Sequence, residues 1–206
     1  KLIKDLAAKL GLAYTASCDW VNLYYDGVYR GIYLISEKNA VGTTSVAITD
    51  MEAAYKQLNQ NYGVGMTTKQ AENSYGQQYQ YTTNLTEPAN ITGGYLIELN
   101  HDMWDEVSGF KTRQGVAFNV KSPEWCGNAA MKYISEYYQE FEDAVYATDE
   151  TGAYTGYNTA TGKYFYDYVD MDSLVKVFLL QELSLNCDGF ISSVYFYKDA
   201  DGMMYA

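Results

Sequence analysis

Oxygen-bearing side chains gather where an apolar segment ends near the C-terminal part of the sequence. Residues 172–185 are largely apolar, and Glu182, Asn186 and Asp188 lie at the point where this segment gives way to a polar one. Carboxylate and amide oxygens are the ligands that hard divalent cations prefer. The residues alone leave two interpretations open: a cation site, or an asparagine and an aspartate that end a helix and begin a turn.

Several other chemistries are excluded by the sequence. His101 is the only histidine, so a histidine-based triad or a multi-histidine zinc site cannot be built. Neither a GxGxxG nor a GxxxxGK[ST] phosphate-binding motif is present. The net charge is −12 and the basic residues are scattered, which argues against a nucleic-acid partner. No apolar run approaches the roughly 18 residues of a membrane span.

Several separate blocks of the sequence together resemble the spore coat protein H (CotH) kinase-like family. The last block contains QEL, Asn186-x-Asp188 and SVYFYK in order. No single block carries the resemblance, which extends over nearly the whole chain. The blocks are, in chain order, residues 26–37 (DGVYRGIYLISE), 93–98 (GGYLIE), 121–124 (KSPE) and 169–198.

The resemblance implies roles for the residues that follow the apolar segment. Asp188 stands where the family has an aspartate similar to the catalytic-loop aspartate of protein kinases. Asp188, Asn186 and Ser193 are the expected metal ligands, with ATP and Mg²⁺ or Mn²⁺ as cofactors. Many family members have an asparagine where this chain has Ser193, a neutral but weaker ligand.

The resemblance also implies a lysine that contacts the nucleotide phosphates and a carboxylate that pairs with it. Lys121 is the first candidate and Lys38 the second. Glu37, Glu98 and Glu182 are the carboxylates that could pair with this lysine, and the sequence does not distinguish between them.

The function that the resemblance implies is ATP-dependent phosphoryl transfer to a serine or threonine hydroxyl of a protein, by a secreted or cell-surface bacterial kinase. We expect residues 1–206 to form one domain cut at both ends. The family's second acidic metal-binding motif is expected after Ala206, and the chain by itself is expected to be inactive. In an exported protein, Cys18 and Cys126 would be the better disulfide pair, since Cys187 lies beside Asp188.

A non-catalytic binding module is the alternative function. The chain has 23 tyrosines, and Trp20, Trp104 and Trp125 could join them in a platform that stacks on sugar rings. Such a module would belong to an extracellular assembly on a cell surface or on a polysaccharide-degrading complex.

The elements that must position these residues mix helices and hairpins without a βαβ repeat, which predicts an α+β class with an incomplete, atypical kinase-like fold. We expect helices over residues 2–10, 51–62 and 131–145, with Thr49 and Glu52 forming a capping box. Residues 172–185 are expected to form a buried central helix, because they leave almost no polar face.

Strands are expected in a hairpin over residues 19–37 and at residues 94–99, 116–121 and 192–198. A turn is expected at residues 199–202. Residues 60–92 are polar and show no clear period, so we expect a long mobile loop beside the nucleotide site.

Overall fold

A seven-stranded antiparallel sheet is the largest element of the computed structural model, which describes residues 1–104, 106–200 and 202–206. The fold is α+β, as the sequence predicts. The predicted strands at residues 94–99, 116–121 and 192–198 are confirmed within two residues. In spatial order the strands are β11 (Met204–Tyr205), β10 (Val194–Lys198), β5 (Tyr95–Asn100), β7 (Ala117–Ser122), β6 (Gly109–Lys111), β4 (Gln78–Thr82) and β3 (Thr68–Glu72).

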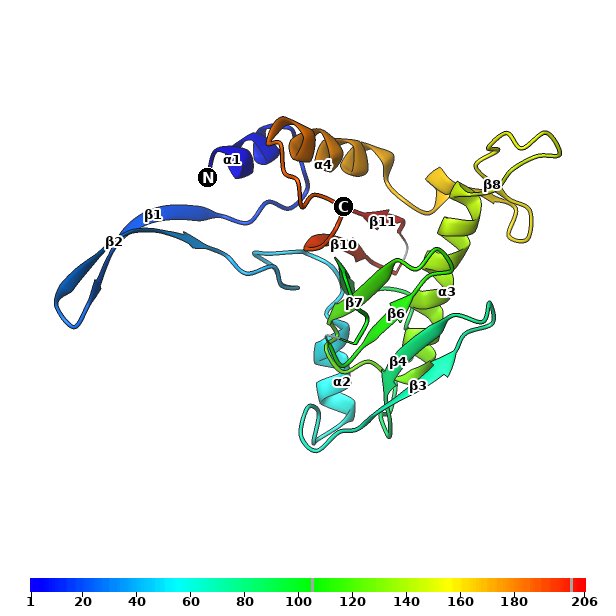
Figure 1. Cartoon of the computed structure of the whole chain (residues 1–206). Helices are drawn as coiled ribbons and strands as arrows, with labels where there is room; N and C mark the ends of the chain where they lie inside the picture. The colour runs from blue at the N-terminus through cyan, green and yellow to red at the C-terminus, as the bar shows by residue number, and fades with distance from the viewer. Residues whose placement is uncertain (105, 201) are drawn as a thin grey trace.

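Helix α3 (Asn128–Val145) covers one face of this sheet and encloses the core (Figure 1). Its buried residues Met131, Ile134 and Tyr138 follow a helical spacing on a single side. They meet alternate strand residues such as Ile97 and Phe118, and Phe118 and Tyr138 lie 4.6 Å apart between ring centroids. The core therefore lies between α3 and one face of the sheet, and the opposite face is left for other contacts.

Helix α2 (Met51–Leu58) adds Met51 and Tyr55 to the same core. It begins one residue later than the expected capping box implies. Asp50 is the N-cap, and its side chain accepts a hydrogen bond from the backbone N–H of Ala53 at 2.8 Å. An aspartate serves this position as well as threonine does, because both offer an oxygen to the unpaired N–H groups of the first turn.

The expectation of a mobile loop over residues 60–92 is wrong. Strands β3 and β4 form a hairpin there, and β4 joins β6 so that the hairpin extends the sheet. The residues of β4 alternate between glutamine or threonine and tyrosine, and Tyr79 is buried against α3. A polar strand is stabilised here because tyrosine supplies apolar surface on one side while its neighbours remain solvated.

The expectation of a buried central helix over residues 172–185 is also wrong. Helix α4 (Met171–Leu183) lies on the surface beside α1 (Leu2–Lys9), and only Ser173 and Leu180 are buried (Figure 1). Leu183 is 67% exposed. Burial on all sides requires several neighbouring elements, and the eight-residue α1 can cover only one side of α4.

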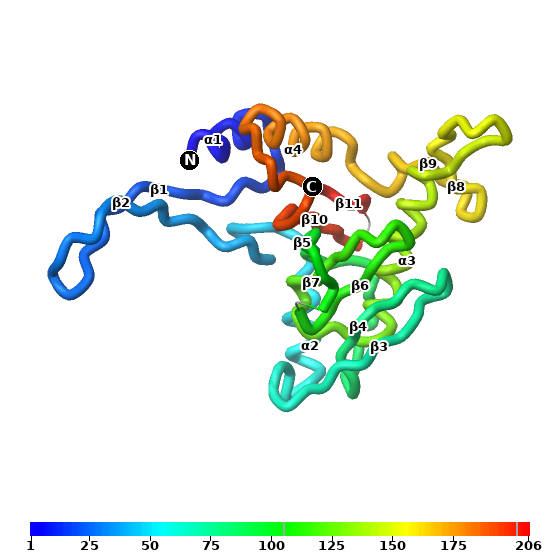
Figure 2. The backbone as a smooth tube through the Cα atoms, viewed as in Figure 1, coloured from blue at the N-terminus to red at the C-terminus, as the bar shows by residue number. Residues whose placement is uncertain are grey.

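The predicted N-terminal hairpin is confirmed as β1 (Cys18–Tyr25) and β2 (Val28–Ser36). It extends away from the seven-stranded sheet, as the backbone trace shows (Figure 2). Asp26 and Gly27 form its turn with positive φ angles of 50° and 74°. A smaller segment that follows the C-terminal end of α3 contains β8 (Tyr157–Asn158), β9 (Lys163–Tyr164) and the short helix η1 (Phe165–Asp167).

The three cysteines do not form the expected disulfide. Cys18, Cys126 and Cys187 are all free thiols. Cys126 is part of the core, whereas Cys18 lies on the projecting hairpin, so the pairing of these two residues is wrong. Of the predicted turn over residues 199–202, Asp201 lies outside the described residues. Within the described part of the chain, no helix is both long enough and apolar enough to cross a bilayer.

Candidate functional site

The face of the sheet opposite α3 carries a row of polar side chains. Successive residues of a strand point to opposite faces, so Glu98 of β5 and Tyr195 of β10 lie on the face that does not enter the core. These two residues are register partners, and the Tyr195 hydroxyl donates a hydrogen bond to Glu98 at 3.0 Å. Asn119 of β7 lies opposite Glu98 on the other side.

Lys121 occupies an irregularity in strand β7. The register passes from the pair Ile97 and Val120 to the pair Leu96 and Ser122, which leaves Lys121 without a partner in β5. An extra residue of this kind is a β-bulge, which re-aims a side chain and is frequent beside functional sites. Lys121 lies two residues after Asn119, so its side chain points to the same face of the sheet as Asn119 and Glu98.

Two glutamates surround the ammonium of Lys121. Its Nζ atom lies 3.4 Å from Glu98 Oε2 and also contacts Glu106 Oε1 directly. Burial works against the charged form of Lys121, but the hydrogen bond that Lys121 donates to Glu106 and the charges of both glutamates outweigh it, so the pKa of Lys121 is raised. Lys121 is therefore a fixed positive charge at neutral pH. The pKa of Tyr195 is also raised, first by burial and then by its hydrogen bond to Glu98.

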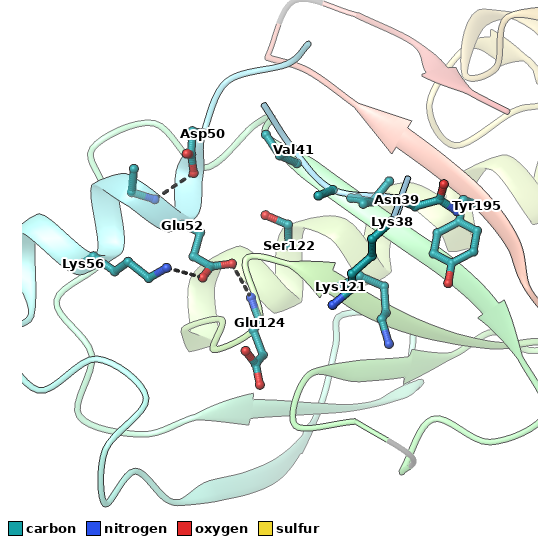
Figure 3. Close-up of a pocket in the computed structure, with 13 residues that line it drawn as sticks. Lys38, Asn39, Val41, Asp50, Glu52, Lys56, Lys121, Ser122, Glu124 and Tyr195 are labelled. Atoms are coloured by element: carbon teal, nitrogen blue, oxygen red, sulfur yellow. Dashed lines mark hydrogen bonds and ion pairs between the residues drawn. The ribbon is translucent and has the colours of Figure 1, made fainter. Parts of the chain in front are cut away.

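A cavity of about 430 Å³ opens above Lys121 (Figure 3). The segment 38–41 forms one side, the first turns of α2 form another, and Lys121, Leu96 and Tyr195 line the sheet side. The two lysines proposed as nucleotide contacts, Lys121 and Lys38, thus line the same cavity although 83 positions separate them in the sequence (121 − 38).

Two of the three acidic side chains that line this cavity are already engaged. Asp50 caps α2, and Glu52 forms an ion pair with Lys56 at 2.6 Å. Glu52 also accepts a hydrogen bond from the backbone N–H of Glu124, at 3.4 Å. These contacts appear as dashed lines in Figure 3. With Lys38, Lys56 and Lys121 balancing Asp50, Glu52 and Glu124, the lining groups carry no large net charge.

A second cavity of about 330 Å³ shares Asn39, Leu96 and Tyr195 with the first one. It is also lined by Lys4 of α1 and Gln181 of α4. The two cavities are therefore neighbours, and together they reach from the N-terminal end of α2 to Gln181 in the last turn of α4. We call the two cavities together the Lys121 cleft.

The three expected metal ligands lie in the connection between α4 and β10. Asn186 and Asp188 are exposed, and the Asn186 side chain donates a hydrogen bond to Gln181 Oε1 at 2.6 Å. The backbone N–H of Ser193 donates to the Leu99 carbonyl at 2.9 Å, which fixes the start of β10. Among the described residues, no three histidine, cysteine or acidic side chains are grouped closely enough to hold a metal ion.

Two of the expected carboxylates lie apart from Lys121. Glu37 accepts hydrogen bonds from the backbone N–H and the hydroxyl of Ser17, at 3.0 and 2.9 Å, and these bonds lower its pKa. Glu182 is exposed on α4. Of the three carboxylates that the sequence left open, Glu98 is the one that pairs with Lys121.

Sequence reasoning missed Tyr195 and Glu106 as members of the site. The alternation along β10 could have placed Tyr195 on the face of Glu98, since the two strands are neighbours. Glu106 lies in the loop between β5 and β6 and carries no periodic signal. The assembled cleft is lined by four lysines and several hydrogen-bonding groups, which suits an anionic ligand such as a phosphate.

No protein-family model matches the chain, and neither a curated protein nor a solved structure matches it.

Proposed function

We propose that the Lys121 cleft binds the phosphates of ATP and that the protein is an atypical, CotH-type kinase that phosphorylates a protein hydroxyl. The observation that carries the proposal is the pair formed by Lys121 and the buried Glu98, at 3.4 Å, in the cleft that Lys38 also lines. A lysine held by a glutamate is the arrangement that positions nucleotide phosphates in protein kinases. The sequence resemblance supports the same assignment, which includes a kinase-like fold.

Asp188 is proposed to act on the acceptor hydroxyl. In the reaction, the hydroxyl oxygen of a serine or threonine attacks the γ-phosphorus, the bond to the ADP oxygen breaks, and the hydroxyl proton passes to the Asp188 carboxylate. The connection that contains Asp188 lies between two elements that both reach the cleft. Gln181 of α4 lines the cleft directly, and β10 leads from Ser193 to Tyr195, whose hydroxyl contacts Glu98.

The donor chemistry beside Asp188 fits Mg²⁺ or Mn²⁺ but only partly fills a coordination shell. Asp188, Asn186 and Ser193 would offer a carboxylate, an amide oxygen and a hydroxyl, which are hard oxygen donors. Mg²⁺ bound through one carboxylate completes its shell with water and nucleotide phosphates. When bound, the cation would neutralise charge that develops on the phosphates. We propose a secreted or cell-surface location on the basis of the resemblance.

The alternative proposal, a non-catalytic extracellular binding module, gains support at a different place. Tyr164 and Tyr166 are exposed near β9, with ring centroids 5.0 Å apart and ring planes 7° apart. Exposed tyrosine rings of this kind can stack on sugars. The three tryptophans do not join them, because no ring pair of the described residues includes Trp20, Trp104 or Trp125.

Phosphoryl transfer from radiolabelled ATP, with Mg²⁺ and with Mn²⁺, tests the kinase proposal. In the natural protein that carries this chain, Asp188→Ala should reduce transfer by at least a hundredfold, since it removes the proposed proton acceptor. Asp172→Ala is the matched control, because Asp172 is an exposed aspartate of α4 that only pairs with Lys176, at 2.5 Å. Equal transfer by the Asp188 variant and the wild type would contradict the mechanism, and sugar binding without ATP binding would favour the alternative.

A further inference from the structure

The two glutamates that contact Lys121 are held in different ways. Glu98 belongs to strand β5, is only 8% exposed and accepts the Tyr195 hydroxyl at 3.0 Å. The side chain of Glu106 belongs to the loop between β5 and β6 and is 34% exposed. The loop is fixed through its backbone, because Gln80 donates a hydrogen bond to the Glu106 carbonyl at 3.0 Å. The carboxylate of Glu106 can therefore move while its backbone stays in place.

The charge of Lys121 is more than balanced while both glutamates are in contact. One ammonium faces two carboxylates, so these three groups together carry a net negative charge that repels a phosphate. The other charged groups that line the cavity, Lys38 and Lys56 with Asp50, Glu52 and Glu124, do not offset this excess of negative charge. The Lys121 ammonium attracts a phosphate more strongly once one carboxylate has left it.

Glu106 is the carboxylate that can leave. Its side chain is partly solvated, so the exposed carboxylate regains water when it swings out, whereas Glu98 would lose its tyrosine hydrogen bond inside the sheet face. We infer that Glu106 is an internal competitor of the nucleotide: it occupies Lys121 in the ligand-free protein and is displaced by a phosphate. The inference rests on the proposed function. It holds that the nucleotide affinity of the site depends on Glu106, a residue that the family resemblance does not name.

A loss of negative charge at Glu106 should therefore strengthen nucleotide binding. Glu106→Gln keeps the size of the side chain but cannot form the ion pair, so the affinity for Mg²⁺–ATP should rise by about fivefold, the effect of a partly exposed ion pair. Glu98→Gln should lower it, because Lys121 loses the partner that holds it in position. Glu72→Gln is the matched control: Glu72 is an exposed glutamate of β3, outside the residues that line the cleft, and it does not pair with Lys121.

Isothermal titration calorimetry with Mg²⁺–ATP on the natural protein that carries this chain measures these effects, with thermal melting as the check on folding. Tighter binding by Glu106→Gln, with little change for Glu72→Gln and weaker binding for Glu98→Gln, supports the competitor. If the wild type binds and Glu106→Gln binds equally or more weakly, the competitor is disproved and the kinase proposal stands. Equal strengthening by Glu106→Gln and Glu72→Gln also disproves it, because the effect would then be one of general charge.

A second measurement does not depend on nucleotide binding. In the ligand-free protein, NMR titration of the Lys121 side chain should show a larger drop in its pKa for Glu106→Gln than for Glu98→Gln, because Glu106 makes the stronger contact. An unchanged Lys121 pKa in Glu106→Gln would show that the contact is absent in solution and would overturn the inference. If no variant binds ATP while the Lys121 pKa shifts as expected, the proposed function fails and the displacement by ATP fails with it.

Discussion

Lys121 is a single residue in which local irregularity and charge pairing meet. Its side chain leaves the bulge in β7 on the face of the sheet that carries Glu98, and the two glutamates keep its ammonium charged despite partial burial. The sequence identifies Lys121 as a candidate through the KSPE block, but a pairing across strands depends on register. One residue of slip would move Glu98 to the α3 side of the sheet. For this reason three carboxylates stayed open until the strands were placed.

Removal of the Tyr195 hydroxyl tests whether its hydrogen bond to Glu98 supports the site. Tyr195→Phe removes the 3.0 Å hydrogen bond to Glu98 and should weaken Mg²⁺–ATP binding about threefold, because Glu98 then holds Lys121 less firmly. Tyr197→Phe is the control, since Tyr197 lines the same cleft on the same strand. Calorimetric titration gives the ratio. Equal affinities for the two variants would show that the tyrosine does not support the site.

The cysteines provide a second residue-scale test. Burial is the largest of the effects that raise the pKa of the Cys126 thiol, so little of the reactive thiolate forms at neutral or mildly alkaline pH. Cys187 is exposed. A thiol reagent should therefore modify Cys187 within minutes at pH 8 and leave Cys126 unmodified until the chain unfolds, when three thiols are counted. Mass spectrometry of the labelled peptides reads this out, and a count of one thiol after unfolding would restore the disulfide.

At the scale of helices and strands, some predictions from the sequence are confirmed and others are wrong. Strands β5, β7 and β10 were located to within two residues, with a clear alternation of apolar and polar residues in β7, and α3 was located because its apolar residues recur at helical spacing. Strand β4 has the same alternation, but glutamine and tyrosine hide it among polar neighbours. The burial of helix α4 was mispredicted for another reason. An apolar composition favours burial, but whether the helix is buried depends on which elements pack against it.

Helix α3 depends on a carboxylate that precedes it by some forty residues. Glu87 accepts hydrogen bonds from the backbone N–H groups of Ala129 and Ala130, at 2.6 and 2.9 Å, and from the Tyr55 hydroxyl at 3.2 Å. It thus caps the helix N-terminus, where negative charge is favoured. Glu87→Gln should lower the free energy of unfolding by about 1 kcal/mol. Urea denaturation measures this, with the exposed Glu150→Gln as control. No difference between the variants would remove the capping role.

The whole molecule assembles its cleft from segments that no local pattern connects. The cleft is lined by residues 38–41, by α2, by the polar face of the sheet and by the last turn of α4, while α3 covers the other face of the sheet. The sequence named two of the cleft's lysines but could not show that they share a cavity. It also placed Asp188 correctly after a helix, and the position of its side chain relative to the phosphates remains a prediction of the proposed function.

Binding of Mg²⁺–ATP by the natural protein that carries this chain is the most direct test of the central claim. Titration calorimetry should show binding by the wild type and a loss of at least tenfold in affinity for Lys121→Met, since the variant removes the ammonium that meets the phosphates. Lys69→Met should bind like the wild type, because Lys69 is exposed on β3, away from the residues that line the cleft. If the wild type binds no nucleotide, or if Lys121→Met and Lys69→Met bind equally well, the Lys121 cleft is not a nucleotide site.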